Sequence, residues 1–541
     1  MNHIFTSSTM LGVLLFSSLF ISSSADATTY FSGLANDEKE EYTKWVDAHS
    51  SYYPRHTFMP SAGDPSDGAA FFWNINDDAV NFALAVRTEG WVGFGLSEAG
   101  GMIGSDMALI TVAEANTLVD SHVVEDKTYP VTDDCQDWVL EGTTIEDGWM
   151  IIEMSRLLDT GDSQDHAIKY DVDLWSPPTR IIAAWGDSEY VSYHAGKKAR
   201  NSVRLHADHS NRMTEMETLL NTLEEESDGH FDFLEDNFRI PAVETTYQDL
   251  CRTFDELGID LPTGRDMLTV IGAVPVIDEH TAQHIHHFTV YVGKECNEEN
   301  QLTRTMIYAW APGDEGWALP KNVGFPVFDG MNNQAVHMQI HYDNPTLKQG
   351  MRDSSGLKFY YTHDEREHRA GILEVGDPWL SLGGEEIAAG HTKYEFNCPG
   401  SCSAAALLQK ERSVEDQGVT IISEFLHMHQ TGVRMTNEVL RDGQVYHKAS
   451  AEVFDFEQQG VHHVAQESYK VMPGDSFRTA CYYKDGTTFG LASQEEMCIA
   501  YIMYYPAKAL SQGAMDLLAS TLERAWGHLC PRVCTLQVGF S

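Results

Sequence analysis

Histidines gather in three short apolar segments of this 541-residue chain. The first segment contains the adjacent pair His286 and His287, the second ends near His341, and the third contains His427 and His429. Each segment has the composition of a β-strand, in which residues i and i+2 point to the same face. We therefore expect His427 and His429 to face one metal ion, whereas His286 and His287 can share an ion only at a bulge or a strand end.

The histidine spacing predicts metal chemistry without choosing the metal. Imidazole is a common ligand of copper, zinc, iron and nickel, and histidines at this spacing also occur in ordinary cores and surfaces. Signatures of rival chemistries, namely GxSxG, HExxH, GxGxxG and the P-loop, are absent from the sequence. A metal site built on β-strands is therefore the leading interpretation of the residues alone.

Most of the chain has the pattern of short β-strands. Segments rich in aromatic and β-branched residues recur from 68 to 205 and again from 241 onward, which is typical of antiparallel β-sandwiches. Between them, apolar residues from Met216 to Leu223 repeat at helical spacing and acidic residues follow, so we expect an amphipathic helix and an acidic connector. A further helical pattern covers residues 507–524.

The beginning of the chain has the pattern of a secretory signal. An apolar run from Met10 to Ile21 precedes Ala25-Asp26-Ala27, a cleavage pattern of small residues. The run is too short to cross about 30 Å of hydrocarbon, and no later stretch is apolar enough, so we expect no integral membrane anchor. The predicted location is outside the cell or in the lumen of a secretory vesicle.

The charge balance is strongly acidic. The chain has 81 Asp and Glu residues against 36 Lys and Arg residues, a formal net charge of −45. Proteins bind nucleic acid through clustered Lys and Arg side chains, so this charge excludes nucleic acid as a partner. It also disfavours anionic membrane surfaces.

Five motifs around the histidines occur in a familiar order. They are Thr245-Thr246-Tyr247 with Cys251, the pair His286-His287, His341 to Pro345 with Asp353 to Thr362, Leu426 to Gly432, and Glu495 to Cys498 with Tyr504-Tyr505-Pro506. Together they resemble the type II copper, ascorbate-dependent monooxygenases, the family of dopamine beta-monooxygenase and its relatives. The resemblance implies two antiparallel jelly-roll β-sandwich domains, each of which binds one copper ion.

The resemblance also implies which residues hold copper. The ligands of an electron-storing copper would be His286, His287 and His341. The ligands of the copper at which oxygen and substrate react would be His427, His429 and Met497. A thioether among the ligands favours Cu(I), the form that reacts with oxygen.

The implied reaction inserts one oxygen atom from O2 into an aliphatic C–H bond, benzylic or amine-bearing, of a small molecule. Ascorbate would return electrons to the two copper ions one at a time. A rival branch of the family hydroxylates peptidylglycine and carries an Arg and an Asn that bind the substrate carboxylate. Phe425 and Ile499 stand at those positions here, so we expect a substrate without a carboxylate.

An upstream segment resembles a DOMON domain. The resemblance rests on Gly90 to Gly95 and on Gly100 to Asp106. Met102 and His194 resemble the axial ligands of haem-carrying DOMON domains, and such ligation suits electron transfer. The alternative function is therefore a secreted haem- or ligand-binding protein. The predicted division is a signal peptide at 1–27, a DOMON domain at 52–206, an acidic helical linker at 207–240, and copper domains at 241–392 and 393–541.

The nine cysteines fit a secreted chain with several disulfides. Comparison with the family implies a Cys251–Cys296 bridge and a Cys481–Cys498 bridge beside the methionine ligand. The remaining expectations are that Cys402 pairs in the tail with Cys530 or Cys534, that Cys135 takes the other tail cysteine, and that Cys398 is left unpaired.

Overall fold

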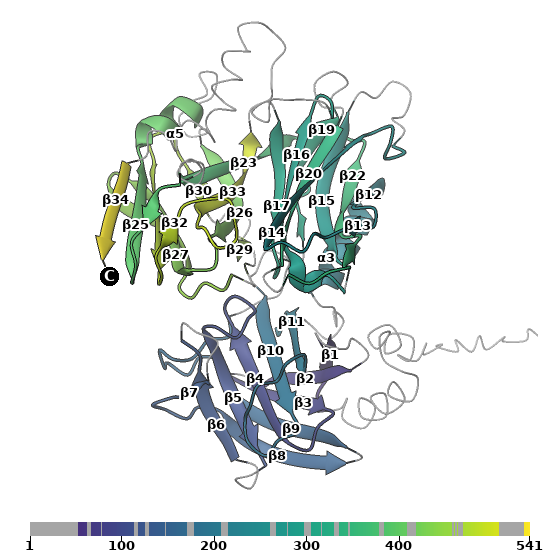
Figure 1. Cartoon of the computed structure of the whole chain (residues 1–541), viewed down its shortest axis with the longest axis vertical. Helices are drawn as coiled ribbons and strands as arrows, with labels where there is room; N and C mark the ends of the chain where they lie inside the picture. Colours follow the sequence, from purple (N-terminus) through teal and green to yellow (C-terminus); the bar gives the residue numbers. More distant parts are fainter. Residues whose placement is uncertain are drawn as a thin grey trace, which may run out of the picture.

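The computed structural model of the chain consists mainly of β-strands, grouped in three bodies (Figure 1). It describes residues 52–540 except 62–66, 77, 113–116, 125–128, 147, 170–177, 207–214, 260–266, 279, 297–303, 315, 329–334, 345–346, 378–383, 408–417, 457–458, 460–461, 464–468 and 508–534. The predicted signal peptide and the helix predicted beyond Ala507 lie outside the described residues.

The N-terminal body is a sandwich of two antiparallel sheets, drawn in purple and blue in Figure 1. One sheet contains, in order, β1 (Arg55–Pro60), β2 (Gly68–Asn76), β3 (Ala79–Val86), β9 (Trp149–Leu157) and β8 (Val139–Glu146). The other contains β11 (Lys198–Val203), β10 (Thr179–Gly186), β4 (Trp91–Ser97), β5 (Ser105–Thr111), β6 (Thr117–His122) and β7 (Val131–Thr132). Rings of Phe71, Phe82 and Phe94 pack together between the sheets.

A second body, here called the first copper unit, follows the helix α3 (Glu215–Glu226). Its elements are β12 (Gly229–Leu234), β13 (Phe238–Arg239), β14 (Thr245–Thr253), β15 (Leu268–Val276), the short 3-10 helix η1 (Ala282–His284), β16 (Ile285–Gly293), β17 (Thr305–Trp310), β18 (Trp317–Ala318), β19 (Val323–Phe328), β20 (Ala335–Asp343), β21 (Arg352–Asp353) and β22 (Gly356–Thr362). The four-stranded sheet β14-β20-β16-β17 forms one of its faces.

The third body is the second copper unit. Its elements are β23 (His368–Asp377), β24 (Glu386–Ile387), β25 (Thr392–Cys398), the helix α5 (Gly400–Leu407), β26 (Val419–His427), β27 (Gly432–Arg441), β28 (Gln444–Ala451), β29 (His462–His463), β30 (Lys470–Val471), β31 (Ser476–Tyr483), β32 (Thr487–Thr488), β33 (Cys498–Ala507) and β34 (Thr535–Phe540). The five-stranded sheet β28-β27-β31-β25-β34 forms its outer face.

One sheet of ten strands runs through both copper units. Its order is β12-β22-β15-β19-β23-β33-β26-β29, with β18 and β30 paired at its side. Strands β19 and β23 join the units through a short parallel pairing, in which Val323 is opposite His368. The two units are therefore fixed side by side, and the predicted fold class, antiparallel sandwiches behind an N-terminal sandwich, is confirmed.

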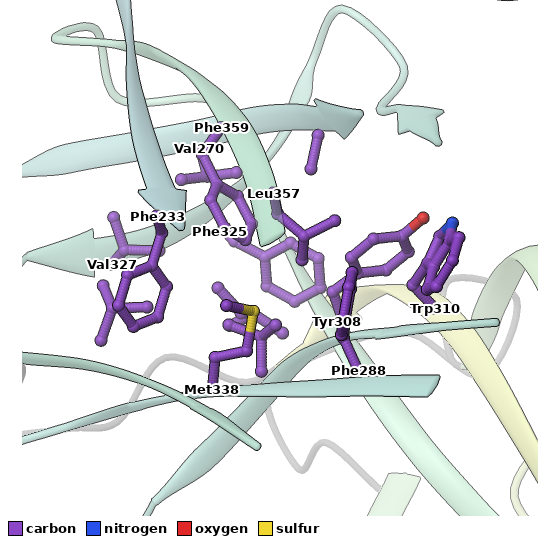
Figure 2. Packing of buried hydrophobic residues seen from close by; sticks show 14 of the residues in the cluster. Phe233, Val270, Phe288, Tyr308, Trp310, Phe325, Val327, Met338, Leu357 and Phe359 are labelled. Carbon is purple, nitrogen blue, oxygen red and sulfur yellow. The ribbon is translucent and has the colours of Figure 1, made fainter. Parts of the chain in front are cut away.

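Alternating apolar residues fill the sandwich interiors, as the strand period requires. In the first copper unit, Figure 2 shows the rings of Phe233, Phe325 and Phe359 near Met338. Phe288 lies beside Trp310 at a ring-centroid distance of 4.7 Å. Because Phe288 directly follows the histidine pair, this packing anchors the strand that carries the pair.

The predicted amphipathic helix is confirmed as α3. Leu219 and Leu223 are buried against the first copper unit, where they contact Ile271 and Val274 among others. The acidic connector predicted after the helix is partly ordered as β12 and β13, which pair with β22 and β21. Among the described residues, no helix is long and apolar enough to cross a membrane.

Two disulfides match the family comparison. Cys251 is bonded to Cys296, and Cys481 is bonded to Cys498. The Cys251 bridge ties β14 to the segment after β16, and the Cys498 bridge ties β31 to the start of β33. Both bridges therefore lie on strands that neighbour the histidines.

Two cysteine expectations were wrong. Cys398, expected to be unpaired, is disulfide-bonded, whereas Cys135, expected to pair in the tail, is a free and exposed thiol. Cys398 ends β25 in the buried core, whereas Cys135 is on the surface of the N-terminal sandwich. Sequence spacing gave no information about these positions in space. The predicted Cys402–Cys530 bridge lies outside the described residues.

Candidate metal centre

The first three histidines lie on the neighbouring strands β16 and β20. His287 pairs with His341 in the antiparallel ladder, and the register shifts between Ile285 and His287, so His286 is an extra residue at the start of β16. This bulge allows two adjacent side chains to reach one side of the strand. The sequence-based expectation that the pair needs a bulge or a strand end is therefore confirmed.

The same nitrogen atom of each imidazole points into this cluster. The Nδ1 atom of His286 lies 3.0 Å from Nδ1 of His341 and 2.9 Å from Nδ1 of His287. All three side chains are buried, and their candidate ligand atoms lie within 4.8 Å of one another. Three nitrogen atoms that converge in this way form a ready set of metal ligands.

Burial keeps these imidazoles neutral. It lowers the pKa of His286 and of His287 well below the usual range, and the neighbouring histidines lower both further. Burial and the nearby His427 lower the pKa of His341 to about 3. A neutral imidazole has a free nitrogen lone pair, which is the form that binds a metal.

The second pair of histidines lies where β26 ends. His427 is the last residue of the strand, and His429 follows in the turn before β27. Between them, Met428 is fully buried in the opposite direction, in the core of the second copper unit. The rings of His427 and His429 are 5.1 Å apart, so the predicted shared face is confirmed, although the second histidine is beyond the strand.

Hydrogen bonds fix which nitrogen of these two rings is free. Nδ1 of His427 donates to Oε1 of Gln459 over 2.8 Å. Nδ1 of His429 points to the carbonyl oxygens of Ala492 and Glu495 at 3.1 and 3.0 Å. Both rings therefore keep their proton on Nδ1, and Nε2 carries the lone pair. Nε2 of His429 is buried and has no hydrogen-bond partner, which suits a ligand atom.

Met497 lies directly before β33, the strand that pairs with β26. In that antiparallel ladder His427 is opposite Ile499. Continuing the same register by two residues beyond His427 and two residues before Ile499 puts Met497 opposite His429. Met497 is 8% exposed, and its carbonyl oxygen accepts a hydrogen bond from the Tyr483 hydroxyl over 2.8 Å. The next residue, Cys498, forms the disulfide with Cys481. The backbone at Met497 is thus held by the Tyr483 hydroxyl and by the neighbouring disulfide.

The two groups of histidines face each other between the copper units. Ring centroids of His286 and His427 are 5.7 Å apart, those of His287 and His427 are 5.2 Å apart, and those of His286 and His429 are 5.4 Å apart. The motifs suggested two sites in two domains and gave no sign of this proximity. In the structure, five imidazoles from both units form one buried cluster.

Several residues that are not proposed as ligands support the cluster. Tyr247 stacks on His341 at 4.5 Å, and Phe456 stacks on His286 at 4.2 Å. Glu496 is fully buried, and burial raises its pKa to about 7. Its carboxylate accepts hydrogen bonds from the backbone N–H groups of His429 and Thr431, at 2.9 and 2.6 Å.

These supporting residues differ in how visible they were in the sequence. Tyr247 and Glu496 stand inside motifs of the family comparison, so their motif positions could have marked them. Phe456 and Gln459 lie in no motif. Their role depends on packing between the two units, which no local pattern records.

The candidate haem ligands are not brought together. The ring of His194 lies 6.5 Å from that of Trp91, the first residue of β4. Met102 belongs to a turn that is tied to Ser97, the last residue of β4, through a 2.6 Å hydrogen bond from the Ser97 hydroxyl to the Gly101 carbonyl. The Met102 side chain packs against a cluster that includes Met107 and Leu109, and no described contact joins it to His194, so a shared haem stays a prediction.

A cleft lies beside the second histidine pair, between the copper units. It is narrow, with a cavity volume of about 20 Å³, which is room for about one water molecule, and its walls include Tyr308, Ile372, Phe425, Tyr501 and Met503. The rings of Phe425 and Tyr501 lie 5.8 and 6.4 Å from that of His427. A small aromatic molecule could enter only if these walls moved apart, because ligand pockets usually measure about 300–1,000 Å³.

The donor set fits copper. The cluster contains five neutral imidazoles from two pairs of strands. The thioether of Met497 belongs to the residue that continues the register opposite His429. Imidazole with thioether is a ligand set that suits copper in both oxidation states, whereas calcium and magnesium prefer oxygen ligands. The unpartnered Nε2 of His429 is the observation in this structure that most directly indicates a missing ligand partner.

Comparison with known proteins supports this interpretation. The N-terminal domain of copper type II ascorbate-dependent monooxygenases matches residues 231–349, their C-terminal domain matches residues 368–522, and the DOMON domain matches residues 66–174. The chain is similar to human DBH-like monooxygenase protein 1, with 30% identity over 85% of this chain and 75% of the relative.

More distant relatives show the same similarity. MOXD1 homolog 1 of Drosophila melanogaster is 26% identical over 88% of this chain and 71% of its own. Dopamine beta-hydroxylase of Rattus norvegicus is 24% identical over 83% of this chain and 72% of its own. With the histidine cluster, the disulfides and the sandwich fold in agreement, the chain belongs to the copper type II, ascorbate-dependent monooxygenases and is an enzyme of that kind.

Proposed function

We propose that this monooxygenase hydroxylates an aliphatic C–H bond, benzylic or next to an amine, in a small substrate that has no carboxylate. The observation that carries the proposal is the buried cluster of five neutral imidazoles beside an aromatic cleft. Copper held there would supply one-electron transfer and oxygen activation, with ascorbate as the reductant. The chain's own residues hold the metal, orient the substrate and exclude water.

Two copper ions per chain are part of this proposal. The ligands of the electron-storing ion would be His286, His287 and His341. The ligands of the ion beside the substrate would be His427, His429 and Met497. The cleft supports this assignment of roles, because two of the residues that line it, Phe425 and Tyr501, lie beside the ring of His427.

An acidic side chain near the cleft supports an amine as the substrate. Ile372 lines it, and Glu374 lies two residues further along β23, on the same face of the strand. Glu374 pairs with Tyr501 of β33, and burial raises the pKa of Glu374 to about 7. An ammonium group in the cleft would stabilise the ionised carboxylate of Glu374, because an opposite charge offsets part of the cost of burial.

The peptidylglycine alternative fits less well. Phe425 lines the cleft as a buried aromatic ring, and Ile499 is buried opposite His427. Asp314 also lines the cleft, and none of its lining residues is a lysine or an arginine. A substrate carboxylate would therefore meet apolar rings and acidic groups, which disfavours its burial.

The division into domains and the location also belong to the proposal. The sequence-based division is a signal peptide at 1–27, a DOMON domain at 52–206, a linker at 207–240 and copper domains at 241–392 and 393–541. Because β23 (His368–Asp377) pairs with β33, we propose to move the boundary between the two copper domains from 392 to before His368. The proposed location is the secretory lumen or the exterior of the cell.

Oxygen uptake with ascorbate tests the substrate class. Purified, copper-loaded protein would be given arylalkylamines, matched phenols without an amine, and peptides that end in glycine. We expect ascorbate-dependent oxygen uptake and a hydroxylated product with the amines. Turnover with glycine-extended peptides and none with amines would overturn the proposal.

A further inference from the structure

The outer nitrogen atom of one ligand in the first copper unit is held by the second copper unit. Nε2 of His341 lies 3.1 Å from Oγ of Ser493, which precedes β33. Ser493 is 1% exposed, and its backbone N–H donates to Oγ1 of Thr245 in β14 over 3.3 Å. The serine is therefore built into the contact between the units.

The geometry of this contact selects a tautomer. Nδ1 of His341 faces the other two histidines of its unit, so the ring needs its proton on Nε2 if Nδ1 is to bind a metal. The Ser493 hydroxyl can accept that proton's hydrogen bond and donate its own hydrogen elsewhere. Partners of this kind orient metal ligands and raise their basicity.

A reciprocal contact exists at Gln459, a residue of the second copper unit. Its backbone N–H donates to the carbonyl of Pro312 in the first copper unit over 2.7 Å. Its amide Nε2 donates to the carbonyl of Phe456 over 2.9 Å, which turns Oε1 toward Nδ1 of His427. The orientation of His427 thus depends on a residue whose backbone is anchored on the other unit.

We infer that Ser493 and Gln459 are positioning residues that make copper binding depend on the packing of the two units. Ser493 holds His341 across the contact, and Gln459 holds His427 from a position fixed by Pro312. Linkage requires the reverse as well, so copper binding strengthens the packing of the units. The inference rests on the proposed assignment of the histidines as copper ligands.

Copper affinity of Ser493→Ala tests the inference. Outer partners of metal ligands typically contribute roughly 10–100-fold to affinity. We expect one of the two copper ions to bind roughly 10–100-fold more weakly in a competition assay with a Cu(I) chelator, and the copper-induced rise in Tm to shrink. Ser493→Thr keeps a hydroxyl and should restore both. Ser476→Ala, in β31, is the matched control and should change neither.

Double variants assign the effect to a site. Ser493→Ala should weaken copper further in a Met497→Ala background, which keeps the first site, and should have no further effect in a His341→Ala background. Gln459→Ala should weaken the copper ion at His427 most, and the first ion to a smaller degree, because Nε2 of Gln459 also lies 3.1 Å from Nε2 of His286. Unchanged affinities in Ser493→Ala and Gln459→Ala, or equal losses at both ions in Ser493→Ala, would overturn the inference. Wild-type protein that binds no copper would instead overturn the proposed function.

Discussion

The two histidine groups that meet between the copper units are built in different ways. In the first, a bulge at His286 turns adjacent residues to one side, and the rings converge through Nδ1. In the second, His427 ends a strand and His429 stands in the turn, and both keep Nε2 free because Nδ1 is hydrogen-bonded. Similar ligands thus arise from a strand irregularity in one case and from the end of a strand in the other.

The difference also concerns what supports each group. The ring of His429 is held by carbonyls of its own unit, whereas His341 is held by Ser493 of the other unit. His429, which is held from within its unit, should tolerate changes in packing between the units. His341 and His427 should not, because Ser493 and Gln459 hold them through the contact between the units. The following predictions test how far the two groups differ.

The largest effect is expected for Met497→Ala. The change removes one proposed ligand of the second group and none of the first, so it should leave one copper ion and nearly abolish turnover. Turnover per folded, copper-loaded molecule measures the effect. Met435→Ala is the control, because Met435 is fully buried in the core of the same unit and should cost about 2–5 kcal/mol of stability without loss of turnover per folded molecule.

His341→Ala completes this comparison, since it should damage the first site and slow electron delivery while the second copper ion stays bound. Near wild-type turnover in folded, copper-loaded Met497→Ala would reject Met497 as a ligand.

A smaller effect is expected for Glu374→Gln, which tests the cleft beside the second group. The change should raise KM for amines by about 10-fold, the loss of one charge-assisted contact, and leave KM for uncharged phenols unchanged. The pKa of Glu374 is about 7 because the side chain is buried, so KM of the wild type for amines should fall as pH rises through 7. The variant should show no such step.

The same pKa shift predicts how stability depends on pH. Since burial raises the pKa of Glu374 from 4.5 to about 7, the folded state holds a proton that the unfolded state has already released in that range. Its contribution to stability is therefore present below pH 4.5 and is lost as pH rises toward 7. Thermal unfolding of Glu374→Gln should lack this component; identical pH profiles for both proteins would contradict it.

A still smaller effect is expected for Gly104→Ala, at the contact of the N-terminal sandwich with the second copper unit. A Cβ atom at Gly104 would lie 2.6 Å from Cβ of Val453. Val453 shortly precedes Phe456 and Gln459 in the chain. The control is Gly148→Ala, because Gly148 also has a positive φ but no atom within 4 Å of the added Cβ. We expect Gly104→Ala to lower stability by about 1–3 kcal/mol more than the control, and equal losses of Tm would show that the contact is unimportant.

The weakest expected signal is haem in the DOMON domain. If Met102 and His194 bind haem, protein produced with added haem should show a Soret band that Met102→Ala removes. The described contacts of Met102 and His194 do not join the two residues, so geometry gives this prediction no support. A spectrum without a Soret band would end it.

The sequence predicted the elements and ligands that local patterns encode. Period-2 alternation identified the strands, and the HxH spacing identified the shared side of His427 and His429, because both depend on neighbouring residues only. The adjacent residues His286 and His287 predicted a bulge or a strand end, because neighbouring side chains on a regular strand point to opposite faces. The ladder has a bulge at His286. The helix α3 followed from the spacing of its leucines.

Contacts between distant segments were beyond reach of the sequence. Gln459 and Ser493 are polar residues without a motif, and their significance arises only when two sandwiches pack together. The same reason explains the cysteine errors, since the environments of Cys135 and Cys398 depend on tertiary structure. The closeness of the two histidine groups likewise depends on the pairing of β19 with β23.

Copper analysis of the purified protein tests the central claim most directly. The account predicts two copper ions per chain in the wild type, and one in each of His341→Ala and Met497→Ala, with the remaining ion at a different site in the two variants. One copper ion per wild-type chain, or zinc in place of copper, would contradict the assignment of two copper sites to these histidines and Met497.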